Sequence, residues 1–448
     1  MRLTSRRILD RSFSGLGFLS ITLMAASLVI ILAPIFVRGM QAFVFRATVE
    51  HRRMTLDLFE RGDRAKIRLE AALAMQARGP VYEMLDSFKK DLNIKPASER
   101  TKYKEPLQEL EDALRDLLGP RPGEKQHVLP RRQYGQTRWD RAQIKLQDVL
   151  YRESYDYSDP TKMGRKIRTP RAQDFKGTSL EPLFPYIEQH AEDMLRPRLT
   201  FYWRFLTDVS KDSHFFGGIW PELLGTIYLA LGAMLFAVPL GLISAIYMTE
   251  YARQSRLNSL LRALIGALAG VPSIVFGLFG LAFFINTIHV SNSKSVLAGA
   301  LTLALVILPT VIRASEEAIR AVPHTYKEAA LSLGASKWRT VITVLLPAAL
   351  PGILTGIVIS MGRAAGETAP IIFTAAVSVG DPLKLWETLS QPTPALSWNV
   401  YNLSTEHQKL DELRHVQYGM VLTLVLVVLF LNFAAVVMRA RMSKKLKG

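Results

Sequence analysis

Cysteine is absent from this sequence of 448 residues. No disulfide, thiol chemistry or cysteine-ligated metal site is therefore available, although this absence identifies no compartment. The G-x-x-x-x-G-K-[ST] nucleotide loop and the H-E-x-x-H metal helix are also missing, and the eight histidines include no closely spaced pair of ligands. We therefore expect a chain that is not an enzyme, binds no ATP and has no cofactor of its own.

Apolar residues are abundant at 49% and gather in long runs, which is typical of a membrane protein. The net charge of +17 would suit a nucleic-acid-binding protein. However, acidic residues offset most basic ones in residues 45–215, and the remaining surplus clusters at the ends of the apolar runs. Such clustering follows the positive-inside rule and predicts a membrane partner rather than a nucleic acid.

Six membrane spans are predicted from the apolar runs. The run 16–38 is longer than the core of a cleaved signal, so we interpret it as an uncleaved anchor, with cleavage as the lesser alternative. The other five lie within 217–440, at 219–248, 264–288, 296–312, 352–376 and 418–437. Basic residues in 1–15, in the loops that follow the second and fourth spans, and in 441–448 place both termini in the cytoplasm.

The polar region 45–215 is predicted to be a mostly helical extracytoplasmic domain. Leu107, Leu110, Leu114 and Leu117 repeat at helical spacing before Gly119-Pro120. A second helix is expected at 54–73, whereas 121–176 lacks a strong period and predicts loop or weakly ordered structure. A structural spacer is favoured over a docking platform for another subunit, and no residue decides between them.

A second feature is the polar segment 314–347 between two apolar runs. Ala329 and Ala330 favour a helix, Gly334 permits a sharp turn, and Ser336 can cap a second short helix at Trp338. Two short helices at an angle would form a projection that suits a cleft on a partner subunit. On the residues alone, an amphipathic loop on the bilayer surface is equally open.

Arg363 and Glu367 are charged residues inside the predicted span 352–376. Their spacing places both on one helix face, as an ion pair or facing a polar cavity. Because each charge costs about 2.5–3.5 kcal/mol at the centre of a bilayer, neither is expected to face lipid. Pro370 is expected to disturb the last turns, and two Gly-x3-Gly pairs at 352–356 and 362–366 predict close helix packing. The alternative is a buried pair that only fixes packing.

The run EAALSLGASKWRTVITVLLP at 328–347 resembles the EAA signature of ABC importer permeases, and only Val344 departs from it. The resemblance implies six membrane helices of the importer permease type. It also implies that the segment docks on a dimer of ATPase subunits, which bind ATP and Mg. The coupling residues it implies are Glu328, Ala329, Ala330, Gly334, Trp338 and Pro347.

Three further runs, GVPSIVFGLFGL at 270–281, LPTVIRASEEAIRAVPHTYKEAALSLGAS at 308–336 and RAAGETAPIIFTA at 363–375, are similar to phosphate-specific ABC importer permeases of the PstA type. This resemblance covers about 217–440. It implies inorganic phosphate as substrate, a bacterial inner-membrane location, a homologous second permease and an extracytoplasmic phosphate-binding protein. The substrate-path residues it implies are Arg313, Arg363, Glu367 and Thr368. The long region 45–215 departs from the compact form of the family.

Two rival functions remain. The first is an ABC permease for another oxyanion, namely sulfate, molybdate or phosphonate. The second is a membrane sensor, which would need a cytoplasmic output domain where we find only the tail 439–448. We therefore expect an importer.

Overall fold

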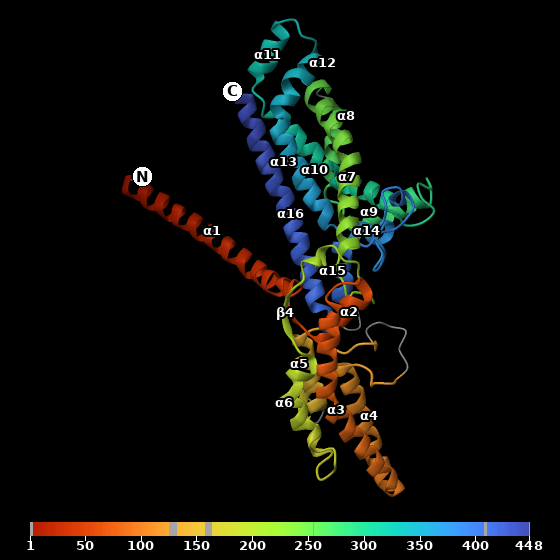
Figure 1. The fold of residues 1–448 in the computed structure, drawn as a ribbon. Coiled ribbons are helices and arrows are strands. Elements are labelled where there is room, and N and C mark those ends of the chain that lie inside the picture. Colours follow the sequence, from red (N-terminus) through yellow and green to blue (C-terminus); the bar gives the residue numbers. More distant parts are fainter. Residues whose placement is uncertain (1–2, 125–131, 157–163, 254, 407–409, 448) are drawn as a thin grey trace. The chain divides into compact units, whose positions relative to one another are not determined.

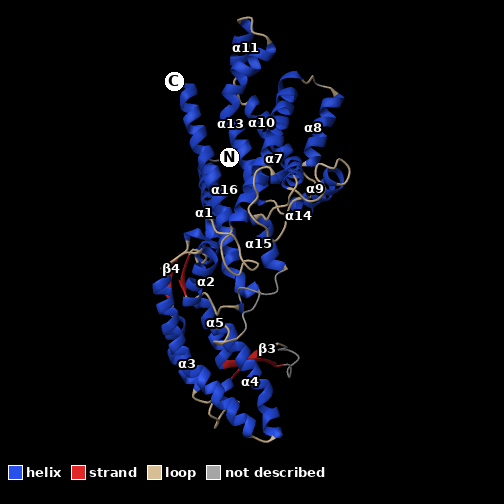
Figure 2. Ribbon diagram, turned by 45° about the vertical axis from the view of Figure 1, so that its right-hand side comes forward, coloured by secondary structure: helices blue, strands red, loops and turns tan. Residues whose placement is uncertain are grey.

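The computed structural model describes residues 3–124, 132–156, 164–253, 255–406 and 410–447 (Figure 1). The chain divides into two compact units: Phe43–Trp203, here called the inserted unit, and the remainder, here called the membrane unit. Within the part of the chain described, helices dominate both units (Figure 2). The all-α membrane fold predicted from the sequence is confirmed, with small strands added in the inserted unit.

The membrane unit is built on long apolar helices. Their bounds are α1 (Leu3–Met40), α7 (Trp220–Ile246), α8 (Arg256–Leu268), α9 (Ser273–Gly280), α10 (Val296–Arg320), α13 (Leu346–Gly366) and α16 (Leu410–Lys447). Shorter helices are α11 (His324–Ser332), α12 (Lys337–Thr340), α14 (Ala369–Thr374) and α15 (Leu396–Thr405), and π-helical turns cover Tyr247–Tyr251, Leu281–Ile285 and Val341–Leu345.

Among the described residues, five helices are long and apolar enough to cross a membrane, or six if the bent pair Arg256–Leu268 and Ser273–Ile285 counts as one span. The third predicted span, 264–288, is therefore not straight. Its two parts are bent by 99° at a break that contains Gly270 and Pro272. Pro272 cannot continue a regular helix because its ring and missing N–H break the hydrogen-bond ladder.

The core of the membrane unit lies where α7, α10 and α13 pack together (Figure 1). Small side chains allow the close approach. A Cβ atom on Gly356 would lie 2.3 Å from the Cβ atom of Ala314, and one on Gly352 would lie 2.8 Å from that of Ala318. The first predicted glycine pair thus packs α13 against α10. Gly362 instead lies against Val428 of α16, and Gly366 has no neighbour within 4 Å of an added Cβ.

The inserted unit holds the helices α2 (Val49–Phe59), α3 (Arg64–Ile94), α4 (Ala97–Leu118), α5 (Trp139–Leu150) and α6 (Leu183–Leu195). The predicted leucine helix is confirmed in α4, and Leu107, Leu110, Leu114 and Leu117 are all buried in its core. The predicted helix 54–73 is wrong, because the chain breaks between α2 and α3. Glu60 adopts a left-handed conformation with φ 54° and Gly62 has φ 111°, and such backbone angles end a helix.

Two antiparallel ribbons complete the inserted unit: β1 (Val44–Ala47) with β4 (Arg198–Phe201), and β2 (Tyr151–Asp156) with β3 (Arg165–Pro170). The prediction of loop over 121–176 is therefore wrong at α5, β2 and β3. The stretches 125–131 and 157–163 of that prediction lie outside the described residues. The β1–β4 ribbon pairs the two ends of the unit, since Val44 lies opposite Phe201.

Candidate transport path and coupling segment

Arg363 and Glu367 form the predicted ion pair at the end of α13. The Nε atom of Arg363 lies 3.1 Å from Oε1 of Glu367, and the two side chains are 43% and 20% exposed. The Nη1 atom of Arg363 also donates to Oγ1 of Thr310 on α10, at 3.5 Å. The guanidinium thus joins two helices and stays partly exposed.

The helix that carries this pair ends earlier than predicted. We expected one span over 352–376, whereas α13 stops at Gly366 and Glu367 has an extended backbone with ψ 125°. The cause is Pro370, which has no N–H to donate to the carbonyl of Gly366 and whose ring would clash with it. Pro370 instead lies in the first turn of the separate helix α14, which begins at Ala369 with Thr368 at its N-cap position. The ion pair therefore lies at a helix break and not within a continuous span.

Arg313 was predicted at the inner end of its span, but α10 continues to Arg320. Its side chain is exposed, and its Nη2 atom lies 2.8 Å from the place where a Cβ on Gly266 of α8 would stand. No hydrogen bond or ion pair links Arg313 to Arg363 or Glu367 among the residues described. The structure therefore brings Arg363 and Glu367 together, with Thr368 adjacent in the chain, and places Arg313 one turn along α10 from Thr310.

The polar segment 314–347, here called the coupling segment, has the two short helices that the sequence predicts. In α11, Glu328 and Ala329 are exposed. Gly334 has φ +83° and turns the chain, and the hydroxyl of Ser336 caps α12 by accepting from the N–H of Arg339. This end of the membrane unit also holds the end of α16 (Figure 1).

Exposed apolar side chains cover the turn of this segment. Leu333 is 89% exposed and Trp338 61% exposed. Large apolar side chains that project singly are common, but two at one turn of a polar segment suit a complementary surface. This arrangement is compatible with docking on a partner.

Helix α12, the second short helix, is continuous with the membrane helix that follows it. Helix α12 continues through the π-helical turn Val341–Leu345 into α13, so that Lys337–Gly366 is one helical rod of 30 residues. The π turn ends at Leu345, two residues before Pro347, whose missing N–H would leave a gap in a regular α-helical hydrogen-bond ladder. Trp338 and Arg363 are thus on the same rod, separated by about 37 Å at 1.5 Å per residue.

The sequence reasoning missed a buried polar cluster at the start of α7. His214 Nε2 lies 2.8 Å from Oε1 of Glu222, and Asn399 Nδ2 of α15 donates to the same oxygen at 3.2 Å. All three residues are buried, at 5%, 1% and 1% exposure. The signal was available, because Glu222 is an acidic residue in the first turn of an apolar, membrane-length run.

This cluster is connected to the ion pair through α15. Two residues before Asn399, the hydroxyl of Ser397 donates to the backbone carbonyl of Glu367 at 3.3 Å. Thr226 of α7 accepts from the N–H of Leu396 at 2.9 Å. Helix α15 is therefore fixed to α7 on one side and to the break after α13 on the other.

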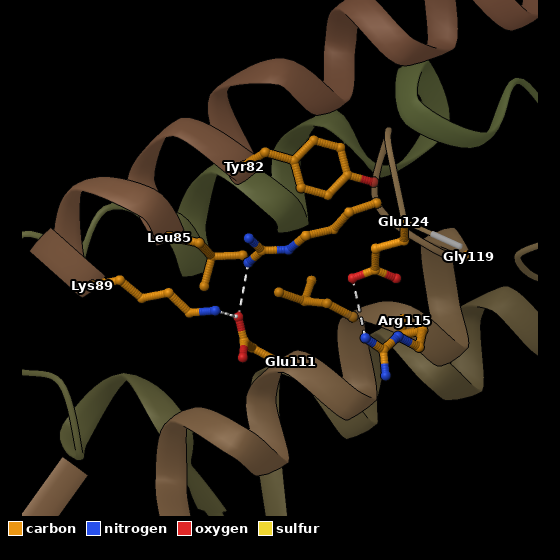
Figure 3. Close-up of a pocket in the computed structure, with 9 residues that line it drawn as sticks. Tyr82, Leu85, Lys89, Glu111, Arg115, Gly119 and Glu124 are labelled. Atoms are coloured by element: carbon orange, nitrogen blue, oxygen red, sulfur yellow. Dashed lines mark hydrogen bonds and ion pairs between the residues drawn. The ribbon is translucent and has the colours of Figure 1, made fainter. Parts of the chain in front are cut away.

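The inserted unit has a small polar cavity of about 140 Å³ between α3 and α4 (Figure 3). Lys89 reaches across to Glu111 at 2.6 Å, and Arg115 reaches Glu124 at 3.1 Å. Arg121 pairs with both Glu111 and Asp86, at 2.8 and 2.9 Å. Since the cations that line the cavity are already paired, its geometry favours a structural role.

Metal binding has no support in the part of the chain that the structure describes. No group of three or more His, Asp or Glu side chains there has the arrangement of a metal site.

The comparisons with known proteins bear on this membrane unit. The family described as "Binding-protein-dependent transport system inner membrane component" matches residues 237–448. A probable ABC transporter permease of Bacillus subtilis, YqgI, is 34% identical over 54% of this chain and 85% of its own length. The phosphate transport system permease protein PstA 1 of Mycobacterium tuberculosis is 38% identical over 50% of this chain and 71% of its own length.

The chain belongs to the PstA-type ABC permeases. A third relative, the phosphate transport system permease protein PstA of Yersinia pestis, is 36% identical over 50% of this chain and 73% of its own length. The permease is accordingly a multi-pass membrane transport subunit. The matched family region, 237–448, lies wholly within the membrane unit and begins after the inserted unit, Phe43–Trp203.

Proposed function

We propose that this permease moves inorganic phosphate inward across a bacterial inner membrane, with its termini in the cytoplasm. The single observation that carries the proposal is the accessible guanidinium of Arg363, held by Glu367 and Thr310 at a break between membrane helices. Planar, paired donors suit the oxygens of a tetrahedral anion. The PstA names of the relatives support phosphate as that anion.

Glu367 has a second role in this proposal. Its carboxylate holds Arg363 in place and competes with phosphate for the guanidinium, which keeps binding weak enough for release. Arg313 and Thr368 would then contribute to the same path on either side of the ion pair. A homologous second permease would complete the path, and an extracytoplasmic phosphate-binding protein would deliver the anion.

ATP hydrolysis on a partner ATPase dimer would drive the cycle. Docking at Glu328, Ala329, Ala330 and Gly334 would transmit closure of the ATPase subunits to the membrane helices. The continuous rod Lys337–Gly366 supports this, because movement at Trp338 is carried along one helix to Arg363. Pro347 lies within the rod, two residues after the end of its π-helical turn.

The test is uptake of labelled phosphate by cells depleted of this protein and complemented with variants. Wild type and the control Arg168→Gln, an exposed change in the inserted unit, should restore uptake. Arg363→Gln should abolish it while the protein still reaches the membrane and assembles. Unchanged uptake with Arg363→Gln and Glu367→Gln together would refute the roles assigned to this pair.

Competition identifies the substrate. Excess phosphate should suppress the uptake of label, whereas sulfate, molybdate and phosphonates should not. If one of those anions competes better than phosphate, the permease serves that oxyanion instead.

A further inference from the structure

The β1–β4 ribbon exposes an apolar face. Val44 lies opposite Phe201, and Arg46 lies opposite Leu199, so these four side chains share one side of the ribbon. Leu199 is 76% exposed, Phe201 65% and Val44 37%. The alternate residues Phe45 and Ala47 are buried at 8% and 0%, on the side that packs into the inserted unit.

This pattern is unusual for a ribbon in water. A two-stranded ribbon with one buried face normally presents polar side chains on the other. Single exposed apolar residues need no explanation, but here adjacent strands place three next to one another. Trp203, 52% exposed, lies two residues after Phe201 in the chain. An apolar face of this kind marks a contact surface.

The short connection between α1 and β1 indicates what this face contacts. Val44 follows the end of the apolar helix α1, Met40, by four residues. Four residues reach at most about 14 Å even when fully extended. The polar layer on each side of a bilayer is itself about 5–8 Å deep. A face tethered this closely to a membrane span lies within reach of the lipid headgroups.

The composition of the face agrees with that location. The indole of Trp203 suits this location, because its N–H can lie in the headgroup layer while the rest of the ring contacts hydrocarbon. The ring of Phe201 adds apolar surface that lipid can cover. Arg46, on the same face, has its side chain 46% exposed and pairs with Glu192 at 3.1 Å, so that a basic side chain and its partner border the apolar group. Membrane-surface segments commonly combine apolar and basic side chains in this way.

We propose that Val44, Leu199, Phe201 and Trp203 form a lipid-contacting face that holds the inserted unit at the membrane surface. This face is distinct from the substrate path and does not depend on the identity of the transported anion. It gives the inserted unit an attachment to the bilayer beyond its two covalent connections.

The absence of cysteine makes the test direct, because each introduced cysteine is the single labelling site. Leu199→Cys and Phe201→Cys are spin-labelled in the full chain, reconstituted in nanodiscs of phosphatidylcholine and phosphatidylglycerol. Collision rates with oxygen, which concentrates in lipid, and with a water-soluble nickel chelate are then compared. Leu28→Cys on α1 serves as the lipid reference, and Ile144→Cys, at an exposed apolar position of α5, as the water reference.

Labels at 199 and 201 should favour oxygen over the nickel chelate several-fold more than the label at 144. Equal access of the chelate at all three positions would overturn the proposal. Exclusion of both oxygen and the chelate at 199 and 201 would also overturn it, in favour of a protein partner that covers the face.

A second measurement uses the native side chain. Brominated lipids should quench the fluorescence of the wild-type permease more than that of Trp203→Phe. If the two proteins are quenched to the same extent, Trp203 does not contact lipid and the proposal fails at that residue.

Discussion

The burial of His51 affects how the stability of the inserted unit depends on pH. It lies in contact with the rings of Phe45 and Tyr202, at centroid distances of 5.2 and 5.8 Å. Desolvation, with the nearby charges of Arg138 and Arg52, lowers the pKa of His51 to about 3. The imidazole is therefore neutral in the folded unit over a pH range where it is protonated in the unfolded chain.

This difference predicts a pH dependence with a definite sign. Because the unfolded chain binds the additional proton between about pH 6.5 and pH 3, the free energy of unfolding should fall as pH falls through that window. One proton corresponds to about 1.4 kcal/mol per pH unit. Urea unfolding of segment 43–203 at several pH values measures the slope. His51→Phe keeps a ring in the site and should reduce the slope by one proton; an unchanged slope would show that His51 is not its source.

Gly356 is a second residue whose role follows from distance alone. An added Cβ would lie 2.3 Å from the Cβ of Ala314, so Gly356→Ala forces α13 away from α10. Overpacking of this kind costs about 1–3 kcal/mol. The thermal midpoint of the purified permease should fall, and adding Ala314→Gly should restore most of it. Gly366→Ala, where the added atom has open space, is the matched control, and an equal loss in the two single variants would contradict the packing argument.

Helices and turns could be predicted from the sequence where residues close together in the chain specify them. Helix α4 and the turn at Gly334 follow from residues close in the chain. The bend of 99° after α8 had a local signal in Gly270 and Pro272, yet apolarity alone gave a straight span. The short ribbons had almost no signal, because four to six residues rich in arginine lack the alternation of a strand.

The candidate site shows the same limit. Arg363 and Glu367 could be paired from their spacing, since four residues place them on one face. The contact of Arg363 with Thr310 joins residues 53 apart in the chain, and the link from Ser397 to the Glu367 carbonyl joins residues 30 apart. Such contacts depend on how helices pack, which no local pattern specifies.

The coupling segment gives a prediction for an element. Gly334 has φ +83° and nothing within 4 Å of an added Cβ, so a side chain there strains the backbone without a clash. Gly334→Val should therefore weaken the turn between α11 and α12 by about 1–2 kcal/mol. Gly334→Asn should be tolerated better, because asparagine adopts left-handed angles more readily.

The readout is phosphate uptake together with ATP hydrolysis by the assembled complex. With Gly334→Val, uptake should fall several-fold at an unchanged amount of permease in the membrane, and Gly334→Asn should retain most of it. Equal activity of both variants would show that the left-handed turn is not needed for coupling.

The whole molecule raises the question of what the inserted unit contributes to transport. The unit has its own core, which includes Leu110, Phe175 and Ile187, and its two ends are paired through the β1–β4 ribbon. The N–H of Tyr202 donates to the carbonyl of Phe43 at 2.6 Å, so the chain leaves the unit close to where it enters. A short connection can therefore replace the unit without separating α1 from the residues that follow Trp203.

This geometry predicts the result of deletion. Replacing residues 44–201 by a short Gly-Ser linker should leave a permease that still inserts, assembles and transports phosphate, because Arg363, Glu367 and the rod Lys337–Gly366 lie wholly in the membrane unit. Uptake in depleted cells within about two-fold of wild type would support the role of a structural spacer for the inserted unit, because the deletion removes no described residue that contacts Arg363 or Glu367. A control that keeps the unit but carries Arg363→Gln should be inactive at the same membrane level. Loss of uptake by the deletion variant, with assembly intact, would instead assign the inserted unit to docking of another subunit.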